Sequence, residues 1–280
     1  MTSLTLKAAL QGANELLSPA SLEAELLLAH VLEKPRSYLF TWPERLLSTE
    51  HIQALQHLVE QRLQGRPIAH LIGKREFWTL DLTVTADTLI PRPETELLVE
   101  LALKCLPQDK ACKVLDLGTG TGAIALAIAS ECPLAQVIAL DQSISALQIA
   151  QLNAQRHTLT TVQFMQSNWF SELPQTSAST FEVIVSNPPY IAEGDPHLSQ
   201  GDVRFEPLTA LTAGYEGLDD LKIIIQQAPY YLKTQGWLLV EHGYDQGIAV
   251  RQLFLQAGFQ TISTQQDLAG HERVTLGHVL

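Results

Sequence analysis

Residues 114–122 have the sequence VLDLGTGTG, in which an apolar run leads into glycines at every second position. The apolar run is typical of a buried strand, and glycine lets the backbone turn sharply and approach a ligand closely. The apolar residues that follow predict a helix over about 121–131. A strand, a glycine loop and a helix in this order predict a ligand-binding unit of a parallel sheet.

The same alternation of strands and helices continues toward the C-terminus. Because alternating units place parallel strands between two layers of helices, we expect an α/β, doubly wound, mostly parallel sheet. Two further strands with no helix between them are expected to pair as an antiparallel edge, which makes seven strands. The predicted strands are 112–117, 136–140, 162–166, 181–186, 236–241, 259–263 and 273–279, and the predicted helices after the first are about 144–156, 218–232 and 245–257.

The first 75 or so residues predict helices and contain no glycine-rich loop. Ser18, followed by a proline, predicts an N-cap with proline at the first helical position. Ser48 or Thr49 predicts the cap of another helix, which ends near Gly65. We expect residues 1–75 to form a small helical domain, which serves either the fold alone or the recognition of a substrate.

Residues 77–85 change the period of the pattern, since apolar and polar side chains alternate there. This alternation predicts a half-buried strand. We expect it to belong to a linking β-hairpin over 76–90. Two prolines and a predicted helix from about residue 94 to 106 follow, so the larger domain is expected to span 91–280.

The composition excludes some classes of function. The 280 residues carry 18 Lys and Arg against 30 Asp and Glu, a net charge of −12, which disfavours nucleic acid as a main partner. No apolar run approaches the ~20 residues that cross a bilayer, so no membrane partner is expected. The scattered Cys105, Cys112 and Cys132 indicate reduced thiols in the cytoplasm. The histidines have no ligand spacing, so no metal site is expected.

Asp141 ends the second predicted strand of the sheet, 19 residues after Gly122. A carboxylate at this place can accept hydrogen bonds from ribose hydroxyls, which indicates an adenosine-containing cofactor. The spacing Gly118-x-Gly120-x-x-Ala also fits a nicotinamide dinucleotide. Asp116 beside the loop favours the cation S-adenosylmethionine over a pyrophosphate. The alternatives are that Asp116 caps the loop and that Asp141 caps the next helix.

The tetrapeptide Asn187-Pro188-Pro189-Tyr190 follows the predicted strand 181–186 directly. Its prolines have no backbone N–H, so the acceptors that remain are the Asn187 side-chain oxygen and the Pro188 carbonyl. Such a corner suits an NH2 group. Two acceptors can orient a planar nitrogen and stabilise the positive charge that develops as it attacks a methyl carbon, with Tyr190 as a stacking surface or wall. The alternative is a rigid turn without chemistry.

The glycine loop together with this tetrapeptide resembles the class I S-adenosylmethionine-dependent methyltransferases that act on planar amino nitrogens. Four further stretches are similar to HemK/PrmC-type release factor glutamine methyltransferases: 89–96 (LIPRPETE), 201–207 (GDVRFEP), 241–243 (EHG) and 271–274 (HERV). The resemblance covers nearly the whole chain, including the helical N-terminal domain. It implies a Rossmann-like methyltransferase domain over 91–280.

The resemblance also implies a reaction, namely N5-methylation of the glutamine in the Gly-Gly-Gln motif of class 1 peptide chain release factors. The cofactor would be S-adenosylmethionine and the protein substrate a release factor. The residues implied for catalysis are Asn187, Pro188, Pro189 and Tyr190. Those implied for cofactor binding are Gly118, Thr119, Gly120, Thr121, Gly122, Asp141, Asn168, Trp169 and Asn187. Asn168 departs from the family, which commonly has Asp there, and the roles of Arg92, Glu206 and His242 are left open.

Other functions remain as alternatives. Adenine N6 of a nucleic acid also fits an Asn-Pro-Pro-Tyr pocket, but no basic stretch with interleaved aromatics accompanies it here. A nicotinamide-dependent oxidoreductase would share the glycine pattern and would leave the double proline unexplained. A ligand-binding adaptor without catalysis, docking a partner on the helical domain, is the third alternative.

Overall fold

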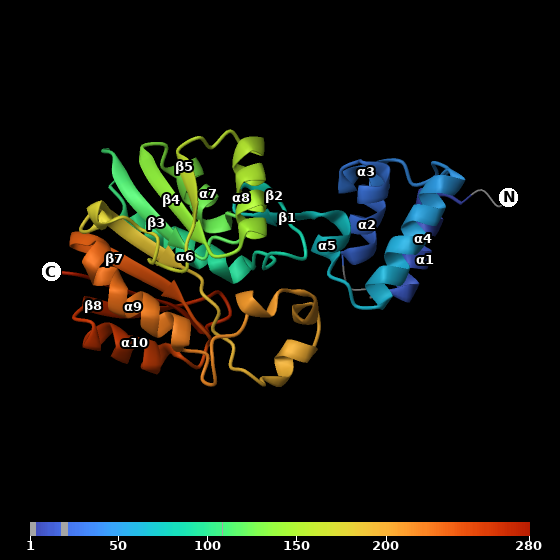
Figure 1. The fold of residues 1–280 in the computed structure, drawn as a ribbon. Coiled ribbons are helices and arrows are strands. Elements are labelled where there is room, and N and C mark those ends of the chain that lie inside the picture. Colours follow the sequence, from blue (N-terminus) through green and yellow to red (C-terminus); the bar gives the residue numbers. More distant parts are fainter. Residues whose placement is uncertain (1–3, 18–21, 108) are drawn as a thin grey trace. The chain divides into compact units, whose positions relative to one another are not determined.

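This computed structural model describes residues 4–17, 22–107 and 109–280 (Figure 1). The chain forms two compact units. The first contains Met1–Lys74 together with Ser199–Phe205, and the second contains Arg75–Leu198 and Glu206–Leu280.

The first unit is helical, as the sequence predicts. Its core is a cluster of leucine, alanine and valine side chains that includes Leu27, Leu28 and Val59. The Ser48 hydroxyl accepts a hydrogen bond from the His51 amide (3.2 Å), which confirms the predicted cap of α4. The cap predicted at Ser18 lies outside the described residues. The helices are α1 (Leu6–Leu16), α2 (Glu23–Leu32), α3 (Arg36–Thr41), α4 (Thr49–Leu63) and α5 (Ile68–Ile72).

A two-stranded hairpin of β1 (Lys74–Phe77) and β2 (Leu80–Thr83) follows. The single strand predicted over 77–85 is therefore wrong, because Trp78 adopts a left-handed backbone (φ 56°) and turns the chain. The apolar side chains of Leu80 and Leu82 are buried, so the alternation itself is preserved. It belongs to the second strand of the hairpin.

The second unit contains a seven-stranded sheet in the order β5-β4-β3-β6-β7-β9-β8 (Figure 1). The first five strands of this order are parallel, and β9 is antiparallel to both β7 and β8. The predicted doubly wound sheet with an antiparallel edge is confirmed. The strands are β3 (Cys112–Leu117), β4 (Ala135–Asp141), β5 (Val162–Gln166), β6 (Phe181–Ser186), β7 (Leu232–Glu241), β8 (Gln260–Gln266) and β9 (Glu272–His278).

Helices cover both faces of this sheet. Val183 and Val185 of β6 pack in one hydrophobic cluster with α6 (Glu96–Cys105) and α7 (Ala123–Glu131), and Ile184 packs in a second cluster with α9 (Asp219–Tyr231) and α10 (Gly247–Gln256). Neighbouring side chains of a strand point to opposite faces, so both faces of β6 are buried. The remaining helix is α8 (Ile144–Arg156), and the short 3₁₀ turns are Pro93–Thr95, Gln175–Ser177, Pro196–Ser199, Val203–Phe205 and Leu208–Ala210.

None of the helices in the described ranges is both long and apolar enough to span a membrane.

The side chain of Asn153 on α8 joins three segments that are distant in sequence. Its oxygen accepts from the Thr83 amide (2.7 Å), and its NH2 group donates to the carbonyls of Thr83 and Thr121 (both 3.0 Å). Asn153 is fully buried. Because buried backbone groups are costly to leave unpaired, Asn153 fixes the hairpin and the glycine loop against α8.

We expect Asn153→Ala to lower the free energy of unfolding by about 3 kcal/mol, because one buried and two partly buried backbone groups lose their partner. Urea unfolding followed by circular dichroism measures the change. The control is Gln155→Ala on the exposed face of the same helix. Equal stabilities of the two variants would contradict the role given to Asn153.

Candidate active site

The glycine loop leaves the carboxyl end of β3 and is held against the end of β4. The amides of Gly118 and Thr119 both donate to the Leu140 carbonyl (2.9 and 2.8 Å). Gly118, Gly120 and Gly122 all have positive φ angles (73°, 56° and 84°). A Cβ atom on Gly118 would also lie 3.3 Å from the ring of Trp169. Glycine is required at this position both for the turn and for the close approach.

Asp116 supports this loop from beneath. Its carboxyl group is fully buried and accepts a hydrogen bond from the Thr119 hydroxyl (2.6 Å). Burial raises the pKa of Asp116 to about 7, against the opposing effect of the Thr119 hydroxyl. Asp116 does not line the cavity at the ends of the strands. Its position therefore matches the alternative in which it caps the loop.

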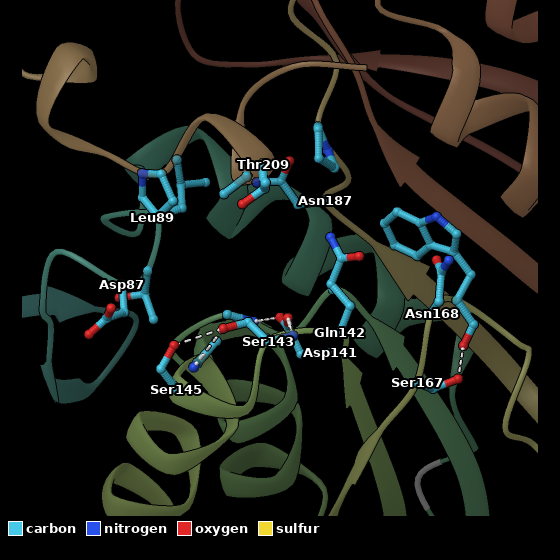
Figure 2. Close-up of a pocket in the computed structure, with 18 of the residues that line it drawn as sticks. Asp87, Leu89, Asp141, Gln142, Ser143, Ser145, Ser167, Asn168, Asn187 and Thr209 are labelled. Atoms are coloured by element: carbon cyan, nitrogen blue, oxygen red, sulfur yellow. Dashed lines mark hydrogen bonds between the residues drawn. The ribbon is translucent and has the colours of Figure 1, made fainter. Parts of the chain in front are cut away.

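A cavity of about 310 Å³ lies where β3, β4, β5 and β6 end. In Figure 2, Asp87 and Leu89 lie on one side of it and Asn168 on the other, and Asn187 lies across from Asp141. Seven of the predicted site residues line the cavity, namely Gly118, Gly120, Asp141, Asn168, Trp169, Asn187 and Pro189. The predicted residues outside its wall are Thr119, Thr121, Gly122, Pro188 and Tyr190, and their roles stay predictions.

Both carboxylate oxygens of Asp141 are anchored by backbone amides. Oδ2 accepts from Gly120 and Oδ1 accepts from Ser143, each at 2.9 Å. Burial raises the pKa of Asp141, and the amides of Ser143 and Gly120 oppose this shift. Because a carboxylate has about four acceptor positions, the group can still bind hydroxyls that enter the cavity. The anchoring fixes the direction in which those acceptors point.

Trp169 forms part of the cavity wall. Its backbone is left-handed (φ 49°), and its indole N–H donates to Asp220 (3.0 Å). The Ser167 hydroxyl donates to the Trp169 carbonyl (2.7 Å). These bonds hold a flat apolar ring at the cavity, which Asn168 also lines.

Asn187 is placed by the end of β6. The hydroxyl of the preceding Ser186 is buried and donates to the Leu117 carbonyl of the neighbouring strand (2.8 Å). The Nδ2 group of Asn187 donates to the Thr95 hydroxyl (3.2 Å). Its Oδ1 atom therefore remains available as an acceptor at the cavity.

Tyr190, at the other end of the tetrapeptide, points to a different partner. Its hydroxyl donates to Glu241 (3.2 Å). Burial and the Glu241 charge raise the pKa of Tyr190 well above its usual value, so the phenol keeps its proton. In this arrangement Tyr190 anchors the loop that carries Asn187.

The residues whose roles the sequence leaves open form buried structural contacts. Glu206 accepts from the Ile90 amide (2.9 Å) and pairs with Arg92. The Nδ1 atom of His242 lies 2.8 Å from the Gly243 carbonyl, which can only accept, so the ring is protonated there. Burial lowers the pKa of His242, which favours the neutral ring. These contacts hold loops in place.

Sequence reasoning missed part of the cavity wall. Two segments far apart in the sequence contribute to it, residues 86–89 after the hairpin and residues 207–210 after Glu206. A signal was present, because the stretches 89–96 and 201–207 that resemble the family overlap these segments. The missed residues are Ala86, Asp87, Thr88, Leu89, Gln142, Ser143, Ser145, Ala146, Ser167, Pro207, Thr209 and Ala210.

Comparisons with known proteins agree with this geometry. The family model described as the methyltransferase small domain matches residues 95–202, and the PrmC N-terminal domain model matches residues 6–73. A methyltransferase structure from Pyrococcus furiosus is 18% identical and aligns over 78% of this chain and 95% of its own with a TM-score of 0.53, which shows the fold.

Two curated relatives identify the family more closely than the fold does. Release factor glutamine methyltransferase from Vibrio cholerae is 53% identical, over 98% of this chain and 97% of its own length. The protein of the same name from Pseudomonas aeruginosa is 54% identical over 92% of both chains. Identity at this level over both units means that the chain belongs to the release factor glutamine methyltransferase family.

Proposed function

We propose that this protein transfers a methyl group from S-adenosylmethionine to the side-chain amide nitrogen of the glutamine in the Gly-Gly-Gln motif of class 1 peptide chain release factors. Membership of the family supports the reaction and the substrate. The observation that carries the proposal is the Asn187 oxygen, an acceptor at a cavity whose other side carries the Asp141 carboxylate.

The residues around the cavity fit S-adenosylmethionine. Asp141 can accept the ribose hydroxyls, Trp169 supplies a flat surface for a base, and Gly118 and Gly120 allow close approach of the backbone. The cofactor supplies a methyl group that is already activated on a sulfonium. The chain therefore needs to bind and orient the two reactants rather than to provide a strong base.

Asn187 recognises the substrate amide. A carboxamide nitrogen is a weak nucleophile because its lone pair is delocalised over the carbonyl. An acceptor that binds its N–H turns the nitrogen toward the electrophilic carbon and stabilises the positive charge that develops on it. Pro188 and Pro189 contribute by having no N–H that would compete for Asn187.

The direct test incubates the full-length protein with methyl-labelled S-adenosylmethionine and a purified class 1 release factor. Parallel reactions contain adenine-rich DNA or RNA instead. We expect one methyl group on the glutamine of the Gly-Gly-Gln motif, located by mass spectrometry, and no label on nucleic acid. Label on adenine, or none on the release factor, would overturn the proposal.

We expect Asp141→Ala to weaken S-adenosylmethionine binding by about 10-fold or more, because charge-assisted hydrogen bonds to the ribose are lost. Calorimetry with S-adenosylmethionine, S-adenosylhomocysteine and NAD measures the affinities. The control is Glu100→Ala, which removes an exposed carboxylate on α6. Unchanged affinity in Asp141→Ala would contradict the ribose assignment, and tight binding of NAD would contradict the cofactor.

We expect Asn187→Ala to lower kcat by about 100-fold while the affinity for S-adenosylmethionine stays within about 2-fold, because one preorganised polar group at the reacting nitrogen is removed. Single-turnover methylation of release factor measures the rate. Gln163→Ala, an exposed amide on β5, is the control. A wild-type rate in Asn187→Ala would remove its role.

Residues 1–75 are proposed to recognise the release factor. The match to the PrmC N-terminal domain model supports this, as do the side chains of Phe40 and Trp42, each more than half exposed. Exposed aromatic residues often dominate protein interfaces. We expect Trp42→Ala to raise the KM for intact release factor by about 10-fold. Cofactor affinity and methylation of a short Gly-Gly-Gln peptide should not change, and an equal loss with the peptide would exclude a docking role.

A further inference from the structure

The side chain of Gln246 joins three loops, and the proposed reaction does not use it. Its Nε2 group donates to the carbonyls of Tyr190 (2.9 Å), Glu216 and Gly217 (both 3.3 Å). Its Oε1 atom accepts from the Gly243 amide (2.8 Å). These partners lie at the end of the Asn-Pro-Pro-Tyr tetrapeptide, before α9 and after β7. One amide side chain therefore ties the substrate-binding loop to two neighbouring loops.

The orientation of the Gln246 amide follows from the chemistry of its partners. A backbone carbonyl can only accept a hydrogen bond, and a backbone N–H can only donate one. The three carbonyls therefore require the NH2 group, and the Gly243 amide requires the oxygen. Turning the amide over would place oxygen against the Tyr190 carbonyl and NH2 against an N–H. The Tyr190 carbonyl is consequently bound by a donor of fixed direction.

Gln246 is attached to a rigid element. Its backbone carbonyl accepts from the Val250 amide (2.9 Å), so the residue stands at the start of α10. Val250 and Phe254 of this helix are fully buried in the same hydrophobic cluster as Ile184 of β6. A side chain that projects from a packed helix is held more precisely than one on a loop. Gln246 thus holds the tetrapeptide from a fixed base.

The loop before α9 fits closely against the same carbonyl group. Gly217 has a positive φ angle (69°), and a Cβ atom there would lie 2.2 Å from the Tyr190 carbonyl oxygen. Glycine leaves the space in which the Gln246 NH2 group reaches both loops. The next residue is also held, since the Ile191 amide donates to the Leu211 carbonyl (2.9 Å).

Bonds at the two ends matter for this tetrapeptide because its prolines have no N–H to bind their surroundings. At one end, Asn187 follows β6 directly and its NH2 group donates to the Thr95 hydroxyl (3.2 Å). At the other end, Gln246 holds the Tyr190 carbonyl. With both ends fixed, the Asn187 oxygen keeps one position at the cavity. A reaction that depends on orientation is sensitive to small displacements of such a group.

We propose that Gln246 is a positioning residue, which holds the tetrapeptide so that the Asn187 oxygen meets the substrate nitrogen. This inference rests on the proposed function. Gln246 does not line the cavity, so it acts through the Tyr190 carbonyl and not on the substrate itself. Its bond from the Gly243 amide belongs to the start of α10, and substitution can separate this bond from the one to Tyr190.

The test compares two substitutions that each keep one half of the amide. Gln246→Glu keeps an acceptor for Gly243 and loses the donor, whereas Gln246→Lys keeps a donor for the Tyr190 carbonyl and loses the acceptor. We expect Gln246→Glu to lower kcat for release factor methylation by about 10-fold, with a Kd for S-adenosylmethionine within about 2-fold of wild type. Gln246→Lys should keep kcat within about 3-fold of wild type. The reverse order of the two rates would mean that Gln246 serves only the start of α10, and would overturn the inference.

Matched controls place the same charges elsewhere on the helix. Gln252→Glu and Gln252→Lys change an exposed glutamine of α10 and should both match wild type. The assays are repeated with a short Gly-Gly-Gln peptide, for which Gln246→Glu should show the same fold-loss, because the defect lies at the reacting nitrogen. A loss confined to the intact release factor would contradict the inference.

Failure of the proposed function looks different in these experiments. If the wild-type protein does not methylate release factor, the proposed function fails, and the positioning inference fails with it. Gln246→Met, which removes donor and acceptor without adding charge, should also lose about 10-fold in kcat, and it decides the result if melting shows that Gln246→Glu does not fold. If wild type is active and Asn187→Ala is impaired while the Gln246 variants match wild type, only the positioning inference fails.

Discussion

The parallel pairing of β3 with β4 on one side and with β6 on the other is the constraint on which the rest of the structure depends. Parallel strands end at the same edge of a sheet, so the residues that follow them must share one crevice. The glycine loop, Asp141 and Asn187 are far apart in the sequence and meet at the cavity for this reason alone. Both faces of the central strand β6 are buried, so its polar side chains gather where the strand ends.

Buried polar side chains then fix the loops that leave this edge. Asn153 binds the glycine loop and the hairpin to α8, Ser186 ties β6 to β3, and Glu206 holds the segment before α6. Each of these groups is costly to bury without a partner, so each bond specifies one arrangement of its loop. A reaction that depends on orientation rather than on a strong base benefits from such rigidity.

The chemistry proposed for the cavity follows from which hydrogen-bonding groups are present and which are missing. Two prolines remove donors from the loop, and the Asn187 NH2 group donates to the Thr95 hydroxyl. In the proposed function, the Asn187 oxygen is the group that faces the substrate. This selects a group that brings its own N–H bonds, such as a carboxamide, and it keeps the positive charge of the reacting nitrogen close to an acceptor.

The sequence by itself determined the order of the elements and the family. Strand periodicity located β3, β5 and β6 with their observed bounds, and the glycine loop and the Asn-Pro-Pro-Tyr tetrapeptide indicated the two halves of the site. Local patterns suffice there because backbone conformation and alternation of burial depend on neighbouring residues. The sequence did not predict the turn at Trp78, because tryptophan has no preference for the positive φ angle that it adopts there.

Only the tertiary structure decided what each polar side chain touches. The carboxyl group of Asp116 would suit a cationic ligand if it faced the cavity, but folding buries it, and it accepts a hydrogen bond from the Thr119 hydroxyl instead. Thr95 lies 92 residues before Asn187 in the sequence and bonds to its side chain only because α6, which follows Thr95 directly, packs against β6 and β7. A hydrogen bond needs donor and acceptor within about 3 Å, and distances of that kind are set by packing between elements, which no local sequence pattern contains.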